Sequence, residues 1–177
     1  MASFGEIIKG AADAKVAILD GTDTPGTNID ILGIKSFSVD VESDSDQQTG
    51  DDAVLATTQE AKSLAISLSA AAANAAALAA MTGATTTTTG TTPSRIITYK
   101  ESSQPVSRYV QLTVQGTGRD TGGSAFRSLI YKAGVESGPS FEMSEGNWME
   151  PSVNLRGVDK AGFLLINSNY ETSVAIT

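Results

Sequence analysis

Apolar and polar residues alternate with a period of two over two stretches of the chain, from Phe37 to Glu42 and from Lys62 to Ser69. That period is expected of a β-strand with one buried and one exposed face. Shorter apolar segments bounded by glycine, proline and other turn residues predict the remaining strands. The predicted strands cover residues 15–20, 31–41, 53–58, 62–69, 96–99, 106–115, 125–133, 141–143, 153–158, 163–166 and 174–176.

A single helix is predicted over residues 70–82. Alanine, which has the highest helix propensity, dominates this run, and Gly83 follows where a left-handed C-cap residue belongs. The threonine-rich residues 84–93 predict an exposed loop, and residues 1–12 predict an N-terminal arm or a helical turn. Many short strands around one helix favour a mainly β fold, a sandwich or a barrel, in one domain over residues 1–177.

A long acidic loop over residues 42–52 separates two of the predicted strands. Most hairpin connections have about two to five residues, so this loop is expected to act outside its own fold, as a docking device, a metal loop or an inert tip. Acidic residues at alternating positions from Asp40 to Asp46 match the start of an EF-hand. However, Ser45 replaces the turn glycine and Asp51 replaces the closing glutamate. A solvated acidic loop without a metal is therefore favoured.

The composition excludes most catalytic sites. The chain has no cysteine and no histidine, so it lacks thiolate nucleophiles, Ser-His-Asp triads and the commonest metal ligands. The glycine-rich residues 116–123 lack the Gly-Lys-Ser/Thr ending of a phosphate-binding loop and precede a strand, so they predict a hairpin loop. Glu142, Glu145 and Glu150 are the glycosidase candidates, but they are typical of surface carboxylates near a turn. Trp148 is more typical of a core edge than of a sugar platform. No enzyme activity and no cofactor are predicted.

The charge balance is acidic, with 20 Asp plus Glu against 12 Lys plus Arg and a formal net charge of −8. Such a surface repels phosphate backbones, which disfavours nucleic-acid binding but suits a protein that must let DNA pass without retaining it. The longest apolar stretch, residues 70–81, is too short for a membrane span, and the N-terminus lacks the features of a signal peptide. We therefore expect the protein to work in solution, with no membrane partner.

Two stretches of the chain resemble the major tail tube proteins of long-tailed, non-contractile bacteriophages. The first runs from Gly33 through the acidic loop and residues 61–69 to the helix ending Met81-Thr82-Gly83. The second is Phe141-Glu142-Met143-Ser144-Glu145-Gly146-Asn147-Trp148-Met149-Glu150-Pro151, followed by a strand. The order of strand, long polar loop, two strands, helix and a second β-rich half is similar to that family.

The resemblance implies a β-sandwich or half-barrel with one flanking helix. It implies that six subunits form a ring, that their sheets join into a barrel around an acidic lumen, and that rings stack into the tube of the virion tail. The long loop would reach into the neighbouring ring, with contact residues Glu42, Asp44, Asp46, Gln47, Gln48, Asp51 and Asp52. The implied partners are further copies of the chain and the tail terminator, baseplate or tip and tape-measure proteins. DNA would pass without specific binding, and assembly would take place in the host cytoplasm.

The acidic loop needs basic or amide partners, which the sequence leaves open among Lys35, Lys62, Arg95, Arg108, Arg119 and Arg127. Two other classes of function also stay open. One is another virion β-protein, such as a capsid decoration or tail terminator subunit, which would form trimers or single rings. The other is a carbohydrate- or calcium-binding β-sandwich module, whose binding would depend on Trp148 or on the metal.

Overall fold

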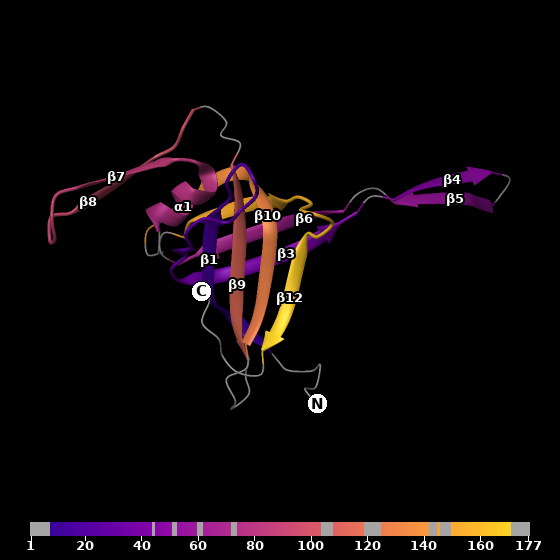
Figure 1. Ribbon diagram of the computed structural model, residues 1–177, viewed down its shortest axis with the longest axis horizontal. Coiled ribbons are helices and arrows are strands. Elements are labelled where there is room, and N and C mark those ends of the chain that lie inside the picture. The colour runs from indigo at the N-terminus through magenta and orange to yellow at the C-terminus, as the bar shows by residue number, and fades with distance from the viewer. Residues whose placement is uncertain are drawn as a thin grey trace.

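The computed structural model describes residues 8–43, 45–50, 53–59, 62–71, 74–103, 108–118, 125–141, 145 and 150–170. The protein is mainly β with one helix, and its strands pair antiparallel (Figure 1). The predicted fold class, a β-sandwich with one helix, is confirmed. The elements are β1 (Ile8–Ile18), β2 (Ile29–Asp30), β3 (Ile34–Glu42), β4 (Ser45–Gly50), β5 (Ala53–Gln59), β6 (Ser63–Ala70), α1 (Ala75–Thr82), β7 (Thr85–Thr89), β8 (Ile96–Lys100), β9 (Tyr109–Gly118), β10 (Ala125–Ser140), β11 (Ser152–Gly157) and β12 (Leu165–Tyr170).

One long strand, β10, divides the main sheet into two layers. Up to Ile130 it pairs with β9 on one side and with β12 on the other. From Ala133 it pairs with β11, while Ala133 and Gly134 stay paired with β9 on the other side. The strand order then continues from β11 through β6 to β3. The register with β9 shifts between Ile130 and Ala133, which places an irregularity where the strand changes layer. In Figure 1 the strands β1, β9, β10 and β12 run across β3 and β6, so the two layers face each other.

The two layers enclose one hydrophobic core. Alternate residues of β1, β9 and β10 in one layer and of β6 and β11 in the other are almost fully buried. The largest fully buried side chains are Leu64, Leu112, Ile130, Leu155, Val16 and Val110. Helix α1 adds Leu78 and Met81 to the same cluster. One-sided burial therefore explains the period of two in the sequence.

Helix α1 begins at Ala75, which corrects the prediction of a helix from residue 70. Ala70 is the last residue of β6, so strand pairing overrides the helix propensity of the first alanines. The side chain of Asn74 caps the helix, accepting hydrogen bonds from two backbone N–H groups of the first turn at 3.1 and 3.4 Å. At the other end, the predicted C-cap is confirmed, because Gly83 is left-handed with a φ of 80°.

Two further segments differ from the sequence prediction. The threonine-rich residues 84–93, predicted as a loop, contain β7, which pairs in register with β8. Threonine is β-branched and favours strands, so the low complexity of this segment does not indicate a loop. Within the predicted arm, residues 1–12, strand β1 already begins at Ile8 and pairs with β9. Residues 1–7 lie outside the described part of the chain.

Most other predicted strands are present with shifted ends. β9 and β10 pair as a hairpin around the glycine-rich residues 116–123, as predicted, although residues 119–124 are not described. Phe141 is outside any strand, whereas the rest of the predicted strand at 141–143 and the whole strand at 174–176 fall outside the described residues.

Candidate functional site

The predicted acidic loop, residues 42–52, belongs mostly to a β-hairpin that projects from the sandwich. β4 pairs antiparallel with β5, and the two form a separate two-stranded sheet that we call the long arm. Figure 1 shows the long arm extending away from the body of the molecule. A strand thus replaces the predicted loop at residues 45–50. The sequence Ser-Asp-Gln-Gln-Thr-Gly has no apolar alternation, so nothing in it indicated a strand.

The structure separates the predicted contact residues into three groups. Glu42 is the last residue of β3 and pairs with Arg156 of the same chain at 3.1 Å, so it belongs to the body of the molecule. Three of the predicted residues lie on β4: Asp46, Gln47 and Gln48. Three others lie outside the described residues: Asp44, Asp51 and Asp52.

A second hairpin, formed by β7 and β8, projects from the opposite side of the molecule (Figure 1). We call this hairpin the short arm. Ile96 and Ile97 on β8 are 63% and 51% exposed, which is unusual for adjacent isoleucines. The turn after β7 requires glycine, because Gly90 has a φ of +78° and a Cβ there would lie 2.6 Å from the carbonyl oxygen of Ser94.

Tyr99 fixes the base of the short arm to helix α1. Its phenol oxygen lies 2.8 Å from the hydroxyl oxygen of Thr82, the last helical residue, and it donates a hydrogen bond to Glu101. Its ring packs edge-on against Phe141, with ring centroids 6.2 Å apart. Partial burial raises the pKa of Tyr99 to about 12, and the hydrogen bond to Glu101 acts in the same direction. The short arm therefore leaves the body from a fixed base.

The outer face of the layer formed by β3, β6, β11 and the second half of β10 is polar, and we call it the polar face. Ser38 pairs with Ser67, which in turn pairs with Asn154 on the next strand. The hydroxyl oxygens of Ser36 and Ser69 lie 2.6 Å apart. An open depression in this face is lined by Ser38, Asp40, Ala65, Ile66, Ser67, Glu136, Ser137 and Asn154.

Arg156 lies on the polar face between carboxylates from two other strands. Its guanidinium lies 2.9 Å from Glu136 and 3.1 Å from Glu42, and it donates to the hydroxyl of Ser63 at 2.9 Å. The hydrogen bond with Glu136 raises the pKa of Arg156 above its usual value. The three carboxylates of Asp40, Glu42 and Glu136 and the one guanidinium of Arg156 give this group a formal charge of −2 (1 minus 3).

The same layer has two edges to which no other strand is paired within the described residues. β3 ends the strand order, and residues 135–140 of β10 pair only with β11. Since β3, β6, β11 and β10 alternate in direction, the two edge segments are antiparallel to each other. An open edge offers unpaired N–H and C=O groups to a strand of another chain.

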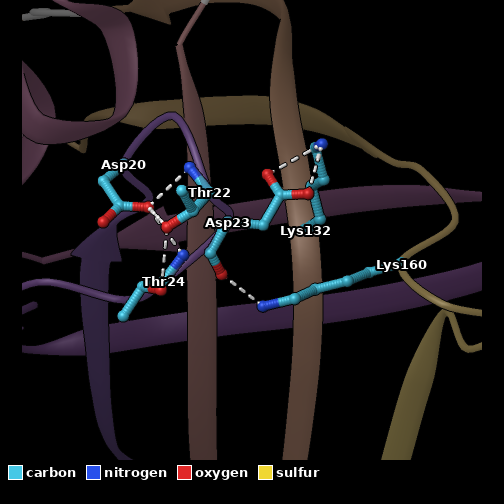
Figure 2. Close-up of polar contacts among 6 residues, drawn as sticks. All are labelled: Asp20, Thr22, Asp23, Thr24, Lys132 and Lys160. Carbon is cyan, nitrogen blue, oxygen red and sulfur yellow. Dashed lines mark hydrogen bonds and ion pairs between the residues drawn. The ribbon is translucent and has the colours of Figure 1, made fainter.

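Asp20 organises the turn that joins β1 to β2 (Figure 2). Its carboxylate accepts hydrogen bonds from the backbone N–H groups of Thr24 and Thr22 at 2.9 and 2.8 Å, and from the Thr22 hydroxyl. The hydrogen bond from the Thr24 N–H, together with those from Thr22, lowers the pKa of Asp20. The carboxylate is thus occupied in holding its own turn.

Asp23 fastens this turn to the point where β10 changes layer (Figure 2). Its carboxylate pairs with Lys132 at 2.9 Å, and its backbone carbonyl accepts a hydrogen bond from Lys160. The ammonium of Lys132 also lies 4.4 Å from the ring centroid of Tyr109. The ammonium groups of Lys132 and Lys160 are therefore both engaged in structural contacts with Asp23, and neither is free to act as a nucleophile.

The candidate chemical sites find little support in the geometry. Within the described residues, no three His, Cys, Asp or Glu side chains are grouped so that they would hold a metal ion. Glu150 pairs with Lys35, and Glu145 is exposed in a turn. Glu142 and Trp148 lie outside the described residues. The one helix that the structure describes is too short to cross a membrane.

The basic residues considered as partners of the acidic loop differ in their surroundings. Three are engaged within the chain: Lys35 with Glu150, Arg108 with the carbonyl oxygen of Ala79 and Arg127 with the side chain of Gln115. Lys62 and Arg95 are exposed and form no ion pair or hydrogen bond in the described part of the chain. Lys100, which the sequence analysis did not consider, has the same properties. Arg119 is not described.

A comparison of the chain with models of protein families finds no match, and a comparison with curated proteins finds none either. Its function is therefore inferred from the two arms, the open edges and the polar face.

Proposed function

We propose that the protein is a structural subunit of a phage tail tube, in which copies join side by side into hexameric rings and the rings stack around a channel for DNA. The observation that carries this proposal is the layer β3-β6-β11-β10, which combines two open edges with a polar and net negative outer face.

The two open edges suit ring formation. Copies related by rotation meet head to tail, so β3 of one copy would meet residues 135–140 of the next. Because these segments are antiparallel within one chain, the junction continues the antiparallel alternation of the sheet. A closed ring leaves neither edge of this layer exposed, which removes a common route to aggregation.

The polar face suits the wall of a DNA channel. The opposite face of the same layer is buried in the core, so a barrel built from this layer would turn the polar face toward the lumen. Its excess of carboxylates repels phosphate groups. Arg156, already paired with Glu42 and Glu136, offers little free positive charge to DNA.

The two arms suit contacts between rings. An isolated two-stranded hairpin is only marginally stable in water, so a hairpin that projects from the body is expected to be stabilised by a partner. The long arm and the short arm leave the molecule on opposite sides (Figure 1), which allows each copy to contact more than one neighbour.

Sedimentation velocity over a concentration series tests this proposal. We expect hexameric rings and larger species that grow with concentration, whereas a protein that stays monomeric throughout contradicts the proposal. Val41, which is 55% exposed on the open edge strand β3, should be covered by the next copy, so Val41→Asp should weaken ring formation. Leu32→Asp is the matched control, because Leu32 is 57% exposed but lies outside the layer.

A further inference from the structure

We propose that the short arm of one copy receives the long arm of a copy in the adjoining ring, with Arg95 and Lys100 binding the acidic side chains of the long arm. This inference rests on the proposed tube, and it names the surface at which the rings contact each other. The occupant of the short arm is thus a second copy of this chain.

The first argument is charge complementarity. The segment that contains the long arm, residues 43–61, has five acidic residues and no basic one: Asp44, Asp46, Asp51, Asp52 and Glu60. The segment that contains the short arm, residues 84–100, has two basic residues, Arg95 and Lys100, and no acidic one. Opposite charges on two surfaces steer their encounter and fix their register.

The second argument is that these two cations are available. In the described part of the chain, most other cations are engaged: Lys15, Lys35, Arg108, Arg127, Lys132, Arg156 and Lys160. Arg95 and Lys100 are exposed and, among the described residues, have no ion pair or hydrogen bond. Lys62 is also available, but it lies outside both arms.

The third argument is the exposed apolar surface beside these cations. Ile96 and Ile97 directly follow Arg95 on the short arm and are more than half exposed. Contact between the two hairpins would remove apolar surface from water as well as pair charges.

The fourth argument is the placement of the arms. They project from opposite sides of one molecule (Figure 1), so the contact joins two different surfaces of two copies. Such a heterologous contact repeats indefinitely unless its rotation closes a ring. Stacked rings would use this property to grow into a tube.

Charge reversal tests the pairing. Arg95→Glu/Lys100→Glu reverses the charge of the short arm. Asp46→Lys/Asp51→Lys reverses two of the five acidic residues in the long-arm segment, whose formal charge goes from −5 to −1 (2 minus 3). We expect each double variant alone to form single rings and to need at least about tenfold more protein to form tubes. An equimolar mixture should form tubes again, because each substituted glutamate on the short arm can then pair with a substituted lysine on the long arm. A chain with all four changes should also form tubes, and it keeps the formal net charge of −8 (−8 minus 4 plus 4).

The outcomes separate the inference from the proposed function. If the unchanged protein forms neither rings nor tubes, the proposed function itself fails. If it forms tubes and Arg95→Glu/Lys100→Glu forms them at the same concentration, only the pairing of the arms is overturned. Loss of tubes in both double variants without rescue in the mixture also overturns the pairing. Lys62→Glu is the matched control for Arg95→Glu, because both replace one cation by glutamate and Lys62 lies outside both arms. Lys62→Glu should leave tube formation unchanged. Circular dichroism of each variant establishes that it is folded.

Discussion

Glu42 lies directly opposite Ser63 in the register between β3 and β6. The chain therefore leaves the body of the molecule and returns to it at one point, and the whole long arm lies between these two residues. The arm is a separate two-stranded sheet inserted into the β3–β6 hairpin.

Replacing residues 43–62 by Asn-Gly should join Glu42 to Ser63 through a two-residue turn, which suits strands that are already paired. We expect the sandwich to fold and the Glu42–Arg156 ion pair to survive, so that thermal unfolding stays cooperative. Rings should form but should not stack. Tubes that match those of the unchanged protein in sedimentation would contradict the role given to the long arm.

Tyr99→Phe should loosen the base of the short arm, because it removes the phenol oxygen that contacts Thr82 and Glu101. We expect a loss of about 1 kcal/mol in the free energy of unfolding near neutral pH. Tyr131→Phe is the matched control, since no hydrogen bond of the Tyr131 hydroxyl occurs among the described residues.

The same tyrosine makes stability depend on alkaline pH. The pKa of Tyr99 is about 12 in the folded chain and 10.0 ordinarily, so ionisation favours the unfolded chain. The contribution of Tyr99 should be fully present below pH 10 and lost as the pH rises toward 12. Urea unfolding across this range should show a smaller decline for Tyr99→Phe than for the unchanged protein. Equal declines would contradict the assigned contacts.

Gly157→Ala should destabilise the sandwich. A Cβ at this position would lie 2.8 Å from the Cβ of Leu64, which is fully buried and cannot move aside. Overpacking of this kind costs about 1–3 kcal/mol, measured as a lower free energy of unfolding in urea. Gly138→Ala is the matched control, because no atom lies within 4 Å of the added Cβ, and it should be neutral or slightly stabilising. Equal stability of the two variants would show that this close approach is absent.

The Asp23–Lys132 ion pair should contribute more than the Lys35–Glu150 pair. The side chains of Lys132 and Asp23 are 19% and 33% exposed, against 55% for Lys35 and 39% for Glu150. A double-mutant cycle with Asp23→Asn and Lys132→Met should give a coupling energy of about 1 kcal/mol. The cycle with Lys35→Met and Glu150→Gln should give less than about 0.5 kcal/mol. The reverse order would argue against Asp23 as the residue that fastens the β1–β2 turn.

The sequence predicts those parts of the fold in which one-sided burial leaves a pattern. The alternation around Leu64, Ile66 and Leu68 identified β6, because one face of that strand enters the core. The cap at Gly83 was predicted for a similar local reason, since a left-handed residue there favours glycine.

The second strand of each arm was predicted, at residues 53–58 and 96–99, and is confirmed as β5 and β8. The first strands, β4 and β7, were not predicted, because neither has an alternation of apolar and polar residues. β4 is polar along its length, and all five threonines of β7 are exposed, so backbone pairing alone makes them strands. The start of α1 was misplaced because the pairing of Ala70 with Ile34 is a contact distant in sequence. The ion pair of Glu42 with Arg156 is equally distant, and no local signal indicated that this acid faces its own chain.

Negative-stain electron microscopy of the purified protein tests the central claim most directly. The proposed assembly predicts hollow tubes of uniform width with a stain-filled channel and regular striations from stacked rings, and isolated rings at low concentration. A field of single globular particles, or of closed trimers that do not lengthen as the protein is concentrated, would contradict it.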